Sequence, residues 1–75
     1  MSNTLSPGRI EAIRDVARAN AALHLRNGRS AREATDLTEY DLLLVLAMDD
    51  PRARNRARDI IRSAVHGYYA ETVAS

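Results

Sequence analysis

The stretch EYDLLLVLAM, residues 39–48, decides what kind of fold this chain can form. After its first three residues it is apolar without alternation, which is typical of a buried helix rather than of a half-exposed strand. A helix that is apolar on every side must be surrounded by other helices or by a second copy of the chain. The stretch therefore predicts an all-α fold that is packed around a helix over residues 39–48.

Capping residues outside this stretch indicate where the other helices begin. Ser6 before Pro7 is a typical helix start, and Ser30 with Glu33 spells a capping box. Thr38 is the expected N-cap of the apolar helix. We therefore predict a compact bundle of three main helices plus one short helix, at about residues 7–27, 31–36, 39–48 and 51–70, in a single domain over residues 6–75 that follows a flexible tail over residues 1–5.

The extent of the last predicted helix depends on Gly67, which is a residue that often ends helices. Tyr68, however, falls on the same helical stripe as Ile61 and Ala64. We therefore expect the helix to continue past the glycine to about residue 70.

The composition limits the chain to one small domain. The 75 residues are 45% hydrophobic and 28% charged, with three Tyr as the aromatic residues and no Cys. The chain therefore has no disulfide and no thiolate metal site, and its apolar run over residues 42–48 is much shorter than the roughly 20 residues of a membrane span. We expect a cytoplasmic protein. All eleven basic residues are Arg, which indicates the codon bias of a GC-rich genome, such as that of an actinobacterium or its phages.

The apolar helix is the predicted dimer interface. Three neighbouring helices in so short a chain enclose it less completely than a symmetric pairing with its own copy. We therefore expect a homodimer whose interface includes the apolar and aromatic positions Tyr40, Leu43, Leu44, Leu46 and Ala47.

Charge is distributed in blocks along the chain. Residues 1–32 hold six Arg and two acids, residues 33–50 hold six acids and no base, and residues 51–62 hold five Arg and one acid. One interpretation is that these charges form solvated faces and pair between helices. The other is a ridge that binds carboxylates or phosphates. The candidate binding residues on the last helix are Arg52, Arg54, Arg56, Arg58, Arg62 and Tyr69.

Two polar residues fall within the apolar arc of the first helix. Asn20 and His24 are one helical turn apart there. A metal or catalytic role has little support, because the chain has no paired-His motif, calcium loop, phosphate-binding loop or nucleophile elbow. A buried hydrogen bond between the two side chains is the simpler interpretation. Tyr68 is expected in the core, and Tyr69 near the Arg residues.

Part of the chain resembles a helix-turn-helix DNA-binding unit. Residues 28–34, Gly-Arg-Ser-Ala-Arg-Glu-Ala, are similar to its opening, and Leu37 and Leu44 lie near its later apolar positions. The resemblance implies a nucleic-acid-binding transcriptional regulator. The second half departs from the pattern, because a recognition helix exposes polar side chains to base edges, whereas residues 42–47 are Leu-Leu-Leu-Val-Leu-Ala.

These observations favour a small protein-interaction module over an enzyme. Four closely packed helices in so short a chain leave little room for a cleft that encloses a substrate. We expect a regulator, adaptor or phage accessory protein that presents an Arg-rich helix face to an acidic protein partner and needs no cofactor or metal. The alternative is a nucleic-acid-binding regulator with a degenerate helix-turn-helix, although its net charge of +1 is low for that class.

Overall fold

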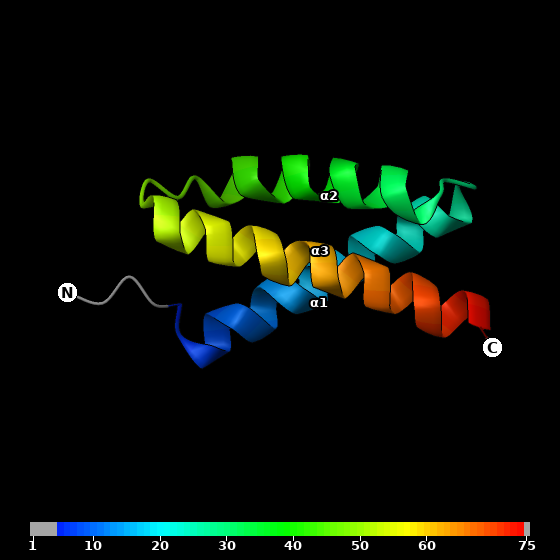
Figure 1. Cartoon of the computed structure of the whole chain (residues 1–75), viewed down its shortest axis with the longest axis horizontal. Coiled ribbons are helices and arrows are strands. Elements are labelled where there is room, and N and C mark those ends of the chain that lie inside the picture. Colours follow the sequence, from blue (N-terminus) through cyan, green and yellow to red (C-terminus); the bar gives the residue numbers. More distant parts are fainter. Residues whose placement is uncertain (1–4, 75) are drawn as a thin grey trace.

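The computed structural model describes residues 5–74, and over them the chain is helical with no strand. Three helices follow one another: α1 (Pro7–Arg26), α2 (Ala31–Leu46) and α3 (Pro51–Ala74). In Figure 1, α1 and α3 run from left to right and α2 runs back from right to left, so α2 is antiparallel to both neighbours. The bundle measures 42 × 20 × 14 Å along its principal axes. The prediction of an all-α fold is confirmed.

Side-chain caps start each helix. The Ser6 hydroxyl accepts a 3.2 Å hydrogen bond from the Arg9 amide at the start of α1. At the start of α2 the Ser30 hydroxyl accepts from the Glu33 amide, and the Glu33 carboxylate accepts from the Ser30 amide. The hydrogen bond that the Glu33 carboxylate accepts from the Ser30 backbone amide, together with its interaction with the Ser30 side chain, lowers the pKa of Glu33. Asp50 caps α3 by accepting a 3.0 Å hydrogen bond from the Ala53 amide.

Helix α2 is continuous where the sequence pattern predicts two helices. Thr38, the expected N-cap of a separate helix, lies in the middle of α2 with its side chain fully buried. It shares the inward stripe with Ala34 and Thr35, which are also fully buried. An unbroken helix turns all three small residues toward the core, and this packing outweighs the local capping signal. The structure therefore has three helices and no separate short helix over residues 31–36.

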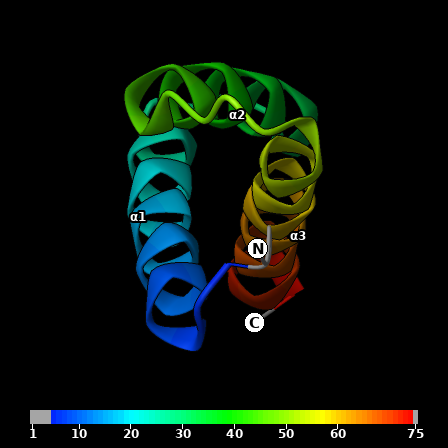
Figure 2. The same ribbon diagram turned by 90° about the vertical axis from the view of Figure 1, so that its left-hand side faces the viewer.

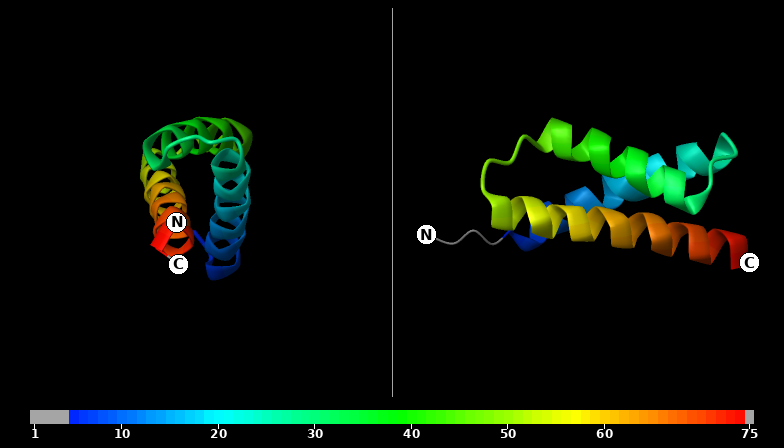
Figure 3. Two further views of the ribbon diagram at one scale, coloured as in Figure 1. Left: turned by 90° about the vertical axis from the view of Figure 1, so that its right-hand side faces the viewer. Right: turned by 45° about the horizontal axis from the view of Figure 1, so that its top comes forward.

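The core is built from aliphatic and small side chains of all three helices. In the end-on views α1 and α3 form two sides and α2 lies across them (Figures 2 and 3). Fully buried alanines at positions 17, 21, 34 and 57 let the helix backbones approach closely. The larger buried side chains belong mainly to α3, and they include Ile60, Ile61, Val65 and Tyr69.

The chain ends of the predicted domain also take defined positions. Helix α3 passes through Gly67 without interruption, as the stripe that contains Tyr68 predicts. Of the tail expected over residues 1–5, residues 1–4 lie outside the described part of the chain, whereas the Leu5 side chain is buried.

Gly28 has φ +78° in the turn between α1 and α2, a conformation that favours glycine.

Candidate partner-binding site between α2 and α3

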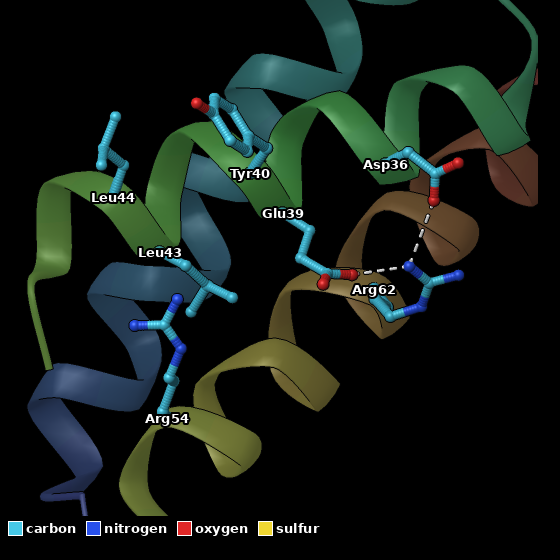
Figure 4. Close-up of a pocket in the computed structure, with 7 residues that line it drawn as sticks. All are labelled: Asp36, Glu39, Tyr40, Leu43, Leu44, Arg54 and Arg62. Carbon is cyan, nitrogen blue, oxygen red and sulfur yellow. Dashed lines mark hydrogen bonds and ion pairs between the residues drawn. The ribbon is translucent and has the colours of Figure 1, made fainter. Parts of the chain in front are cut away.

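A groove of about 370 Å³ separates the second half of α2 from the first half of α3 (Figure 4). Three kinds of side chain meet in it: apolar and acidic residues of α2, and Arg residues of α3. The residues that line it are Asp36, Glu39, Tyr40, Leu43, Leu44, Arg54 and Arg62. Several residues that were predicted as two separate sets, a dimer interface and an Arg face, therefore lie in one site.

Helix periodicity explains why α2 exposes apolar residues here. The residues that pack inward, Ala34, Thr35 and Thr38, leave Leu37, Tyr40 and Leu44 on the opposite side of the helix. Tyr40 is 68% exposed and Leu44 is 67% exposed. Within residues 5–74 no other helix covers these two residues, so the outer face of α2 presents a large aromatic and a large aliphatic side chain to solvent.

One end of the groove is closed by an ion-pair network. The Arg62 guanidinium donates hydrogen bonds of 2.6 Å to Glu39 and 3.4 Å to Asp36, both on α2. These interactions, with Glu39 as the stronger partner, raise the pKa of Arg62 above its ordinary value. Arg62 therefore fastens α3 to α2, and its positive charge is balanced within the chain.

The other end of the groove carries an unbalanced positive charge. Arg54 is exposed, and its side chain extends toward Leu43 (Figure 4). Among residues 5–74 no side chain forms a hydrogen bond or ion pair with its guanidinium. The groove thus has an acidic end that contains Asp36, a basic end at Arg54, and Tyr40 and Leu44 on its outer wall.

The remaining Arg residues of α3 do not form one continuous face. Each residue of a helix turns by about 100°, so residues two positions apart point to nearly opposite sides. Arg54 accordingly lines the groove with α2, whereas Arg56 lines a second groove with Arg14 and Arg18 of α1. Arg58 is exposed and donates a 2.8 Å hydrogen bond to Asn55. The predicted Arg ridge is therefore split between two sides of the bundle.

Tyr69 does not lie on the Arg side of α3. It is 6% exposed, and its hydroxyl donates a 2.8 Å hydrogen bond to the Arg29 carbonyl. Burial raises its pKa. The partly exposed aromatic ring is that of Tyr68, which lies 5.4 Å from the Arg18 guanidinium. The expectation for Tyr69 is therefore wrong, because its hydroxyl is held by the turn between α1 and α2. Tyr68 is half-buried and packs against the core, as expected.

Asn20 and His24 do not bond to each other. The Asn20 amide donates to the Val16 carbonyl within α1. His24 is buried, with Nδ1 3.3 Å from the Arg29 guanidinium and with no partner for Nε2 among the described residues. The two side chains are therefore part of the α1 packing and of the turn that follows, rather than a joint site.

The predicted dimer residues divide into exposed and internal positions. Leu43 is buried and Leu46 is half-buried, so both stabilise the bundle itself. Ala47 is exposed and ends α2 in the left-handed conformation, with φ 48°. Sequence reasoning did not single out Val45, which is exposed and lines an apolar groove of about 290 Å³ with α1. The exposed Val16 on α1 lines the same groove. The continuous apolar run over residues 42–48 conceals which of its members point outward.

The described residues form neither a metal-binding cluster nor a membrane-spanning helix. No group of three or more His, Asp or Glu side chains among residues 5–74 is arranged to hold a metal ion. None of the described helices has the length and hydropathy needed to cross a membrane. Comparison of the chain with models of protein families, with curated proteins and with solved structures finds no match.

Proposed function

We propose that this chain is a small, non-enzymatic protein-interaction module that forms a homodimer through the outer face of α2 and binds an acidic protein partner through Arg residues of α3. The observation that carries the proposal is that Tyr40 and Leu44 are 68% and 67% exposed and line the same groove as Arg54. Tyrosine and arginine are the residue types that most often dominate binding energy at protein interfaces.

The apolar residues supply the affinity in this proposal. Complete burial of an exposed Leu side chain stabilises a complex by roughly 1.5–3 kcal/mol. Tyr40 can bury its ring while its hydroxyl bonds at the edge of the interface. By comparison, an exposed ion pair contributes only about 0–1 kcal/mol. Removal of the Tyr40 or Leu44 side chain should therefore weaken the homodimer more than removal of one Arg side chain.

The exposed Arg residues of α3 determine which kind of partner binds. Arg52, Arg56 and Arg58 are exposed on α3 and form no ion pair with another described residue. Complementary charge accelerates association and disfavours partners with the wrong charge. An acidic protein surface is the partner that fits them.

A nucleic-acid ligand is the alternative within the same proposal. Four exposed Arg on one helix favour it, but their division between two sides of α3 does not form a single track for a phosphate backbone. Such binding would weaken steeply with salt, by roughly 0.9 logarithmic units of affinity per tenfold increase in salt for each phosphate contact.

The experiment is an affinity pull-down from host lysate with and without nuclease, followed by titration of the retained partner against variants. Charge reversal of Arg52, Arg56 and Arg58 to Glu should abolish partner binding, whereas Arg9→Glu on α1 is the matched control. Arg62 is left unchanged because it fastens α3 to α2. A nuclease-resistant protein partner with this variant profile supports the proposal. Equal binding by the triple variant, or recovery of nucleic acid alone, contradicts it.

A further inference from the structure

The two ends of the α2–α3 groove carry opposite charges, with Tyr40 between them along α2. Asp36 lies one helical turn before Tyr40 on α2, and Leu44, which lines the groove together with Arg54, lies one turn after it (Figure 4). The Asp36 side chain is 63% exposed. The surface is therefore nearly self-complementary about an axis through Tyr40.

We propose that a second copy of the chain docks on this surface with its α2 antiparallel to the first α2, so that Arg54 of each copy pairs with Asp36 of the other. A two-fold axis perpendicular to α2 near Tyr40 generates both pairs at once, as an isologous dimer requires. This inference rests on the homodimer part of the proposed function and adds its orientation and contacts.

Charge selects the antiparallel orientation over the parallel one. In a parallel pairing each residue of α2 lies level with its own copy, so Asp36 approaches Asp36. The antiparallel pairing exchanges the ends of the groove and sets each Asp36 carboxylate opposite an Arg54 guanidinium. Like charges placed together across an interface are unfavourable, so the charge at Asp36 favours the antiparallel orientation.

The spacing of the exposed apolar residues fits the same arrangement. Leu37, Tyr40 and Leu44 follow the three-then-four spacing of a helix–helix seam, and all three are exposed. With the axis near Tyr40, Leu37 of one copy packs against Leu44 of the other. The dimer thus covers these three residues, which the monomer leaves in solvent.

The existing contacts of Asp36 allow this exchange. Arg62 contacts two carboxylates, Asp36 at 3.4 Å and Glu39 at 2.6 Å, so Asp36 is its more distant partner. Arg62 keeps its main partner when Asp36 turns to a second copy. Arg54 loses no described partner at all.

Charge exchange between the two positions tests the pairing. Sedimentation equilibrium of Asp36→Arg and of Arg54→Asp should each show a dimer Kd raised at least tenfold, and the double variant should recover most of the wild-type affinity. Arg56→Asp, on the other side of α3, is the matched control and should leave the dimer unchanged. Thermal unfolding by circular dichroism identifies any variant that fails to fold.

A single engineered cysteine tests the position of the axis independently of charge, because the natural chain contains none. Asp41 is exposed beside Tyr40, and its replacement leaves the apolar residues of the seam in place. Asp41→Cys should form a disulfide-linked dimer under mild oxidation, since residues near a two-fold axis approach their own copy within the roughly 7 Å that a disulfide spans. Val73→Cys, exposed near the end of α3, should remain largely monomeric.

The outcomes separate the inference from the proposed function. A dimer that neither recovers in the double variant nor cross-links at position 41 overturns the antiparallel pairing and leaves the homodimer standing. A chain that stays monomeric at every concentration overturns both the pairing and the homodimer. Binding of an acidic protein partner by such a monomer would still support the interaction module.

Discussion

The phenolic hydroxyl of Tyr69 in α3 donates a hydrogen bond of 2.8 Å to the backbone carbonyl of Arg29, which lies 40 residues earlier in the chain. The bond joins the C-terminal half of α3 to the turn that connects α1 and α2. Arg29 also contacts the buried His24 through its guanidinium. This turn is therefore held in place from α3, the helix that supplies most of the large core residues.

Tyr69→Phe should lower the free energy of unfolding by about 1 kcal/mol, the typical contribution of one such hydrogen bond. The variant retains the ring and its packing, so the change reports the hydroxyl alone. Urea unfolding monitored by circular dichroism measures it. An unchanged free energy of unfolding would show that the bond does not hold the turn.

The same residue predicts an alkaline limit to stability. Burial raises the pKa of Tyr69, so the folded chain holds its phenolic proton more tightly than the unfolded chain does. The stabilisation is present below the ordinary tyrosine pKa of about 10 and is lost as pH rises through the higher folded value. Unfolding measured between pH 8 and 11 should show a steeper loss for the wild type than for Tyr69→Phe. Parallel curves would contradict this assignment.

Two buried threonines of α2 make a matched pair. Thr38 has a buried hydroxyl with no partner among residues 5–74, whereas the Thr35 hydroxyl donates a 2.7 Å hydrogen bond to the Ala31 carbonyl. An unsatisfied buried hydroxyl typically costs about 1–3 kcal/mol. We expect Thr38→Val to raise the free energy of unfolding and Thr35→Val to leave it equal or lower. If chemical denaturation shows a lower free energy of unfolding for Thr38→Val than for Thr35→Val, the Thr38 hydroxyl has a hydrogen-bond partner in the folded chain.

The two left-handed residues predict opposite effects of exchanging glycine and alanine. Gly28 has φ +78° and Ala47 has φ 48°. A left-handed residue with a Cβ costs roughly 1–2 kcal/mol, so Gly28→Ala should destabilise the fold and Ala47→Gly should stabilise it. Melting temperatures of the two variants check the prediction. A fall for Ala47→Gly would show that Ala47 contributes a contact that outweighs its backbone conformation.

Asp41 is expected to oppose the proposed dimer. It is exposed next to Tyr40, so an antiparallel pair brings the two copies of Asp41 toward each other near the axis. Asp41→Asn should lower the dimer Kd several-fold at low ionic strength, and the difference should shrink as salt screens the repulsion. Sedimentation equilibrium at two salt concentrations measures both effects. A higher Kd for the variant would place a favourable contact at Asp41 instead.

Capping residues in the sequence predicted where helices begin. One of these predictions failed because the residue is buried in the core instead. Ser6 and Ser30 cap α1 and α2 as their sequence signals predict, and Asp50 caps α3. Thr38 carries the same kind of signal, but its burial in the middle of α2 overrides it. A capping residue and a small core residue look alike in sequence, and only the tertiary contacts distinguish them.

The candidate site was predictable in its parts rather than in its assembly. The apolar stretch pointed to Tyr40 and Leu44, and the charge blocks pointed to Arg54 and Arg62. Nothing in the sequence showed that Arg62 pairs with Glu39 while Arg54 has no described partner, because this depends on how α3 lies against α2. The division of the Arg residues between two sides follows from helix geometry once α3 is known to be one continuous helix.

The central claim, that the outer face of α2 is a protein-binding surface that recognises its own copy, is tested most directly by molar mass in solution. Sedimentation equilibrium from micromolar to millimolar concentration should show the wild type rising from 8.3 kDa toward twice that value. Leu44→Glu should stay at the monomer mass, because it places a charge in the seam, while Val73→Glu should behave as the wild type. A wild type that remains at the monomer mass throughout, or a Leu44→Glu variant that dimerises equally well, would contradict the claim.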